Sequence, residues 1–204
     1  MPAAARDISV ADPGTSAPAV APTDPAHPDA ESVVFAGTKY CLRTRQHDQF
    51  VFTPSGQEDP ARWADMITLI CDSTVSDGKG LAEKAIACWQ GSRDARATIW
   101  HINYVPRLDQ MPARSDALYV LATALARPEH NYDEFAYTTI RFVAGVATTA
   151  RYSHREYREG RSSTERVVSW LTKNESLGES WFTWDGAGEF VRSASSASVD
   201  HASL

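Results

Sequence analysis

The hydrophobic and polar positions of residues 133–157 follow the two-residue period of β-strands, and the segment divides near a single glycine. In the first half, large apolar side chains fall on both faces of the predicted strand, with Tyr137 on one face and Ile140 on the other. We therefore expect this strand to be covered on both sides. The whole segment predicts a β-hairpin with its turn near Gly145.

The second half of the hairpin, residues 146–157, alternates between apolar and polar positions. Ala150 and Tyr152 face one way, whereas the opposite face carries Arg151, Ser153 and Arg155. This alternation is typical of a strand with one face on the core and one face in solvent. We therefore expect Tyr152 to point into the core and the polar row to be exposed.

Comparable patterns predict the other elements of the chain. Strand-like runs occupy residues 32–36, 40–42, 50–54, 65–71, 98–105 and 117–126. Between the fourth and fifth of these runs, apolar residues recur at helical spacing from Leu81 to Trp89. Asp77 is the candidate N-cap of this helix, and Gly91 is expected to end it.

A second helix is predicted near the carboxyl end of the chain. Ser162 and Glu165 have the spacing of a capping box in front of an apolar run. The helix extends or restarts through Trp184 and is expected to stop at Gly186 and Gly188. Because strands and helices arrive in blocks, the sequence predicts an α+β fold, a mainly antiparallel sheet with two helices packed on it.

Composition divides the chain into three parts. Residues 1–31 form an Ala/Pro-rich arm that we expect to be disordered, because it holds six of the eleven prolines and no aromatic side chain. Residues 32–190 are predicted to form a single α+β domain, and residues 191–204 a flexible tail. The arm lacks the apolar core of a secretory signal, so the chain is cytoplasmic as written. If a signal lies upstream, the arm would instead be the spacer of a periplasmic or exported protein.

Charge and cysteine usage exclude some classes of function. The formal net charge of −6 argues against general nucleic-acid binding, and no apolar run is long enough to span a membrane. Cys41, Cys71 and Cys88 can form at most one disulfide within the chain, and their spacing fits neither a zinc nor a redox site. Free thiols are the favoured interpretation. The oligomeric state is left open.

The polar end of the hairpin is the most distinctive candidate surface. Arginine and tyrosine are enriched at protein-binding hot spots because they combine contact area with directional donors. The predicted binding residues are Arg151, Ser153, Arg155, Tyr157 and Arg158. The alternative is an ordinary strand end whose charge is offset by Glu156 and Glu159. On the first interpretation, the partner is another protein.

Candidate catalytic and metal-binding residues are fewer. Ser153 and His154 point to opposite faces of a strand, so they cannot act as nucleophile and base for each other. Four residues with oxygen or nitrogen ligand atoms lie near one turn: Glu129, His130, Asp133 and Glu134. Such a cluster is more often a solvated acidic loop than a cation site. We therefore predict no metal and no cofactor. The alternative function is a hydrolase-type enzyme that uses His130, Asp133 or His154 with a partner not visible in the sequence.

Three short segments resemble a group of bacterial, often exported, proteins. Residues 52–59 and 63–68 resemble the opening of these proteins, and residues 152–157 resemble their last strand. The order of elements over residues 35–185 also resembles the PsbP-like fold, which photosystem accessory proteins, DcrB-type envelope proteins and some type VI secretion chaperones share. The resemblance implies a non-enzymatic protein-binding scaffold. With the Arg/Tyr-rich strand, it predicts a chaperone or immunity-like role in an envelope, secretion or toxin-neutralising pathway.

Overall fold

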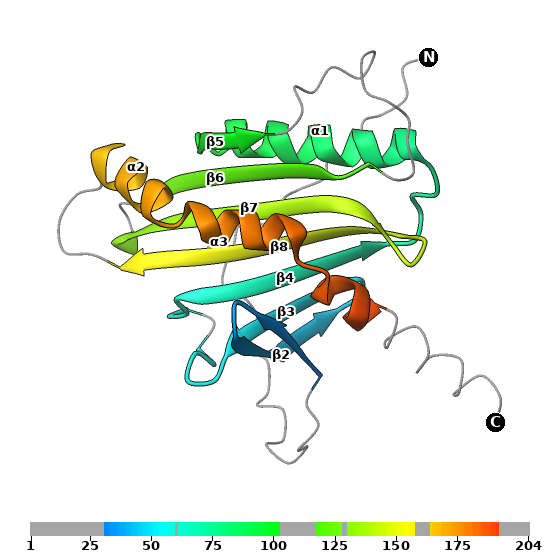
Figure 1. Ribbon diagram of the computed structural model, residues 1–204, viewed down its shortest axis with the longest axis horizontal. Helices are drawn as coiled ribbons and strands as arrows, with labels where there is room; N and C mark the ends of the chain where they lie inside the picture. Colours follow the sequence, from blue (N-terminus) through cyan, green and yellow to red (C-terminus); the bar gives the residue numbers. More distant parts are fainter. Residues whose placement is uncertain (1–30, 60, 103–116, 128–129, 158–163, 192–204) are drawn as a thin grey trace.

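The computed structural model describes residues 31–59, 61–102, 117–127, 130–157 and 164–191. Within these residues, eight strands form one sheet in the order β1-β2-β3-β4-β8-β7-β6-β5, and all neighbours are antiparallel (Figure 1). The strands are β1 (Ser32–Phe35), β2 (Thr38–Gln46), β3 (Gln49–Pro54), β4 (Asp65–Asp72), β5 (Thr98–Ile102), β6 (Tyr119–Arg127), β7 (Tyr132–Val143) and β8 (Val146–Tyr157). The predicted α+β class and the antiparallel sheet are confirmed, whereas the PsbP-like fold stays a prediction.

The helices differ in number from the prediction. The described residues contain α1 (Gly78–Asp94), α2 (Thr164–Lys173) and α3 (Glu175–Thr183), and residues 186–191 are also helical. The predicted second helix is therefore divided. It breaks at Asn174, whose side-chain amide donates to the carbonyl of Trp170 at 2.8 Å and so satisfies the end of α2.

Glycine does not end the helices where the sequence predicted it would. Helix α1 continues past Gly91 to Asp94, and Arg96 takes the left-handed conformation just beyond it, with φ 58°. The predicted N-cap of α1 is confirmed, because the Asp77 carboxylate accepts a hydrogen bond from the amide of Gly80 at 2.7 Å. Gly186 does not stop a helix either. It lies against the Trp184 ring, where a Cβ atom has no room.

The hairpin of β7 and β8 is confirmed, and its turn consists of Ala144 and Gly145. Tyr152 points into the core, as expected, and its side chain is buried. The expectation that the opposite face of β8 is exposed is wrong for Ser153, which is fully buried, and for Arg155, which is 7% exposed. The reason is that other side chains cover this face, since the rings of Trp63 and Tyr132 pack on the Arg155 guanidinium.

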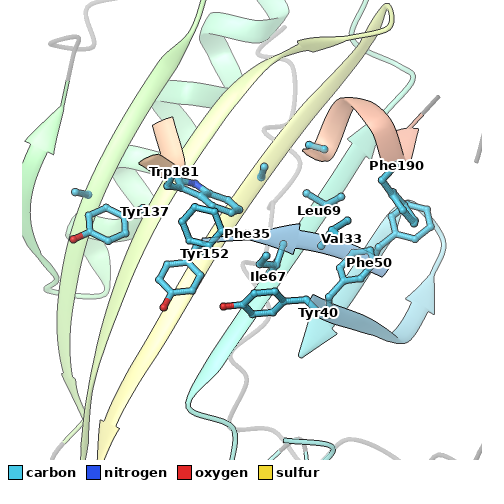
Figure 2. Close-up of a cluster of buried hydrophobic side chains, with 14 residues drawn as sticks. Val33, Phe35, Tyr40, Phe50, Ile67, Leu69, Tyr137, Tyr152, Trp181 and Phe190 are labelled. Atoms are coloured by element: carbon cyan, nitrogen blue, oxygen red, sulfur yellow. The ribbon is translucent and has the colours of Figure 1, made fainter. Parts of the chain in front are cut away.

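Helices cover both faces of the sheet. On one face, Leu81 and Ala82 of α1 pack against Ile140 and Ala147. On the other face, Trp181 of α3 packs against Phe35 and Tyr152, with ring centroids 4.9 and 5.8 Å apart (Figure 2). On β8, the odd-numbered residues therefore face α1 and the even-numbered residues face α3.

Several sequence expectations bear on this core. Trp181 is fully buried and stacks on the half-buried Trp184 at 4.6 Å, so this pair belongs to the core rather than to an exposed groove. Cys41, Cys71 and Cys88 are free, and each is half-buried. No helix in the described part of the chain is long and apolar enough to cross a membrane. The predicted arm and tail lie almost wholly outside the described residues and stay predictions.

Candidate functional site

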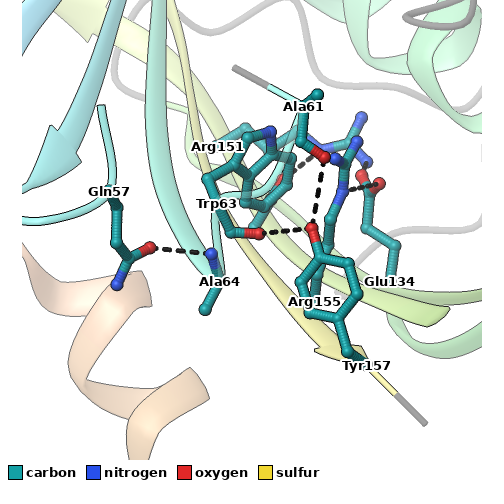
Figure 3. A network of polar contacts seen from close by, with 9 residues as sticks. Gln57, Ala61, Trp63, Ala64, Glu134, Arg151, Arg155 and Tyr157 are labelled. Carbon is teal, nitrogen blue, oxygen red and sulfur yellow. Dashed lines mark hydrogen bonds and ion pairs between the residues drawn. The ribbon is translucent and has the colours of Figure 1, made fainter. Parts of the chain in front are cut away.

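A buried carboxylate organises the α1 face of β8. The register of the hairpin places Glu134 of β7 directly opposite Arg155 of β8. The Glu134 carboxylate accepts from Arg151 Nη2 at 3.1 Å through one oxygen and from Arg155 Nε at 3.3 Å through the other (Figure 3). Arg151 Nε also donates to the hydroxyl of Ser153 at 3.1 Å. One carboxylate thus fixes two guanidinium groups on a single strand face.

Arg155 is enclosed by aromatic rings as well. Its guanidinium carbon lies 3.8 Å from the centre of the Trp63 ring and 4.3 Å from that of Tyr132. Its backbone amide donates to the carbonyl of Ala64 at 2.7 Å. Since Trp63 is itself buried, these contacts hold the segment before β4 against the end of β8. Arg155 is therefore a structural member of the network.

Tyr157 closes the same end of the strand. Its hydroxyl donates to the carbonyl of Trp63 at 3.0 Å, and the carbonyl of Ala61 lies at 3.4 Å. The residue is nevertheless 44% exposed, because the ring stands at the margin of the sheet. An exposed tyrosine is here held in one orientation by backbone carbonyls of the segment before β4.

The predicted binding residues therefore divide into two kinds. Arg151, whose side chain is 41% exposed, and Tyr157 present surface to solvent. Ser153 and Arg155 are buried beneath them. Arg158 lies outside the described residues. The network also contains residues that the sequence analysis did not connect with this strand: Trp63, Tyr132 and Glu134.

A second polar network lies on the opposite face of β8. His154 Nδ1 is 2.9 Å from Asp65 Oδ1, and the hydroxyl of Tyr152 donates to that same oxygen at 2.6 Å. The backbone amides of Ala64 and Asp65 both donate to the side-chain oxygen of Gln57, each at 2.7 Å. These bonds fix the start of β4, and with it the Asp65 carboxylate, against β8.

The electrostatics of this network follow from burial and hydrogen bonding. Burial opposes ionisation of Asp65, but the hydrogen bonds from His154 and Tyr152 outweigh it and hold the pKa of Asp65 below its ordinary value. Burial, followed by the hydrogen bond to Asp65, raises the pKa of Tyr152. Asp65 is therefore an anion at neutral pH, with a neutral tyrosine and an imidazole bound to it.

An aromatic stack supports the imidazole of His154. The Trp170 ring of α2 lies 5.1 Å from the His154 ring at an interplanar angle of 18°. Trp170 stacks in turn on Phe135, at 4.0 Å. Both His154 and Asp65 remain about one-quarter exposed at the side chain, with 24% and 25%. Sequence reasoning missed Asp65, which is 89 residues from His154 in the chain.

The described residues that were considered as cation ligands do not converge on one point. His130 stacks on Tyr132 at 5.8 Å, and Glu134 is engaged by two arginines. Asp133 precedes Glu134 in β7 and so faces the other side of the sheet. Glu129 lies outside the described residues. In the described part of the chain, no three His, Cys, Asp or Glu side chains lie close enough to hold a metal ion.

Comparisons with known proteins give little further guidance. No protein-family model and no curated protein matches the chain. A solved structure from Bacteroides thetaiotaomicron VPI-5482 aligns at a TM-score of 0.33 and 10% identity, over 66% of this chain and 40% of that one. Human STARD10 aligns at a TM-score of 0.29 and 6% identity, over 69% and 72%. At these TM-scores the similarity carries no argument about fold or function.

Proposed function

We propose that this chain is a protein-binding domain, that this binding role is non-enzymatic, and that the exposed ends of Arg151 and Tyr157 are central to its contact surface. The observation that carries this proposal is their attachment to the buried Glu134 network. Each side chain is exposed, yet each is fixed by hydrogen bonds to residues beneath it. Side chains that are already ordered lose little conformational entropy when a partner binds.

The spacing and charge of this surface indicate the kind of partner. Arg151 and Tyr157 lie on one face of the same strand and are about 20 Å apart along it, a distance suited to a protein surface rather than a small ligand. Two guanidinium groups share one carboxylate, so the network keeps a net positive charge. We therefore infer an acidic contact region on the partner.

The biological setting rests on the resemblance described above. On that basis we propose an envelope, secretion or toxin-neutralising pathway, with a chaperone or immunity-like role. Membership of the PsbP/DcrB-like group and a periplasmic or exported location belong to the same proposal. The contacts of Arg151 and Tyr157 support the binding role alone.

The test compares substitutions at the proposed surface with a charge reversal on α1. The tagged wild-type protein is used to recover partners from lysate, and each recovered partner is purified and titrated against the variants. Arg151→Glu and Tyr157→Ala should each weaken binding about tenfold or more, as for hot-spot residues. Lys79→Glu is the matched control, because Lys79 is 69% exposed on α1 and its charge is reversed in the same way. Binding unaffected by both surface variants would overturn the proposal.

A further inference from the structure

We propose that His154 and Asp65 form a general-base site that hydrolyses uncharged carboxylic esters. This site is independent of the proposed binding surface, because His154 and Arg151 lie on opposite faces of β8. The two proposals therefore succeed or fail separately. The inference starts from the 2.9 Å contact between His154 Nδ1 and Asp65 Oδ1.

The contact with Asp65 determines which imidazole nitrogen is the base. A carboxylate accepts hydrogen bonds, so Asp65 holds the proton on Nδ1 and leaves the lone pair on Nε2. Among the described residues, none hydrogen bonds to Nε2. Because the His154 side chain is 24% exposed, water has access to the ring. This is the arrangement in which an oriented imidazole accepts a proton from water.

Further contacts hold the two groups in place. Tyr152 donates to the Asp65 oxygen that faces His154, and Gln57 fixes the backbone of Asp65. Trp170 covers one face of the imidazole. Asp65 is a positioning residue in this scheme, since it acts through His154. The supporting shell limits the movement of both rings and so favours a fixed direction for Nε2.

The surroundings of His154 favour an uncharged substrate with an aromatic group. Among the described residues, the Asp65 carboxylate is hydrogen-bonded to the imidazole, the Trp170 ring stacks on it at 5.1 Å, and the centre of the Phe135 ring lies 6.4 Å away. A carboxylate next to the base repels phosphate and other anionic esters. The half-buried Trp170 ring offers an apolar surface to an aryl group.

The reaction balances with water as the second reactant. Nε2 takes a proton from water while the water oxygen forms a bond to the ester carbonyl carbon. The resulting tetrahedral intermediate expels the alkoxide or phenolate, and the C–O bond to the leaving group breaks. The imidazolium returns its proton to the leaving group or to solvent. Asp65 stabilises the imidazolium without itself taking a proton.

The test follows release of 4-nitrophenolate from 4-nitrophenyl acetate by the full-length protein. His154→Gln should reduce the rate about 100-fold, the lower range for loss of a general base. His47→Gln is the control, since His47 is exposed and its removal would reveal any hydrolysis by surface imidazoles. Equal rates for wild type and His154→Gln would overturn the proposal.

Two further measurements separate chemistry from folding. Asp65→Asn should lower kcat about tenfold or more with KM nearly unchanged, and Asp65→Glu should restore part of kcat because it keeps the carboxylate. The wild-type rate should also fall in D₂O, since a proton moves in the rate-limiting step. A wild-type rate no higher than that of the same concentration of imidazole, or one unchanged in D₂O, would contradict the general-base role without any variant.

Discussion

The guanidinium carbon of Arg155 lies 3.8 Å from the centre of the Trp63 ring, while Arg155 Nε donates to Glu134. The side chains of Arg155 and Glu134 are only 6% and 10% exposed. Among the described residues, removing Arg155 would leave Arg151 as the one ion-pair partner of the buried Glu134 carboxylate. We expect Arg155→Ala to lower the free energy of unfolding by about 2 to 4 kcal/mol, measured by urea denaturation.

Arg45 provides a matched control for this prediction. Its guanidinium carbon lies 5.0 Å from the centre of the Phe50 ring, and it pairs with Glu31 at 3.2 Å. Its side chain is 51% exposed, so solvent screens both interactions. Arg45→Ala should therefore cost less than about 1 kcal/mol. If the two variants lose equal stability, burial of the Arg155 network adds nothing to the free energy of unfolding beyond what an exposed ion pair gives.

The Arg155 network shows how much of this region can be predicted from sequence. The period-two pattern placed Arg151, Ser153 and Arg155 on one face of β8, which the structure bears out. A two-residue turn at Ala144 and Gly145 also fixes the register, and that register brings Glu134 opposite Arg155. The ion pair of Glu134 and Arg155 could therefore be predicted from the sequence once the length of the turn was assigned.

The remaining contacts were not available from local pattern. Trp63 reaches Arg155, and Asp65 reaches His154, only because β4 pairs with β8. Strand order is decided by long-range packing, and nothing near residue 65 specifies its neighbour. For the same reason, the alternation of polar and apolar residues in β8 predicted an exposed polar face, whereas Ser153 and Arg155 on that face are buried. A strand inside a sheet can bury polar side chains when they pair with each other.

Buried tyrosines predict a loss of stability at alkaline pH. Burial raises the pKa of Tyr137 from 10.0 to about 12, and burial is also the main cause that raises the pKa of Tyr40 and Tyr152. Below pH 10 both states keep these protons. Above pH 10, the unfolded chain releases the tyrosine protons before the folded chain does. The free energy of unfolding therefore falls as pH rises, by about 2 to 3 kcal/mol from Tyr137 alone.

Urea unfolding at about pH 9, 10 and 11 would measure this effect. Tyr137→Phe should give a shallower decline, because one of the raised groups is removed. Absorbance of tyrosinate provides a second measurement, since the buried hydroxyls should ionise together with unfolding. A free energy of unfolding that stays constant across this range would contradict the assignment.

The turn between β7 and β8 contains a residue that fits its conformation poorly. Ala144 has φ 49° and is followed by Gly145 with φ 81°, the signs that a type I′ turn requires. Asparagine tolerates the left-handed region better than alanine does. We expect Ala144→Asn to raise the free energy of unfolding by about 0.5 to 1 kcal/mol. Thermal unfolding should show the opposite sign for Ala144→Val, since a β-branched side chain is strained there.

The close approach of α3 to β7 depends on Gly178. A Cβ atom at this position would lie 2.7 Å from Cε1 of Tyr137. Alanine favours a helix over glycine by about 1 kcal/mol, but overpacking costs about 1 to 3 kcal/mol. Tyr137 is not free to move aside, because it is buried and its hydroxyl donates to the carbonyl of Asn174 at 3.2 Å. Gly178→Ala should therefore be destabilising, by about 1 to 2 kcal/mol in urea denaturation.

A double-mutant cycle separates the contact from helix propensity. Ser180→Ala is the control on the same helix, because Ser180 is exposed and should change stability by less than about 0.5 kcal/mol. Tyr137→Leu removes the ring that the new Cβ would meet. In that background, Gly178→Ala should become neutral or stabilising, since only the gain in helix propensity remains. If it costs the same with and without the Tyr137 ring, the close packing of α3 on β7 does not explain the glycine.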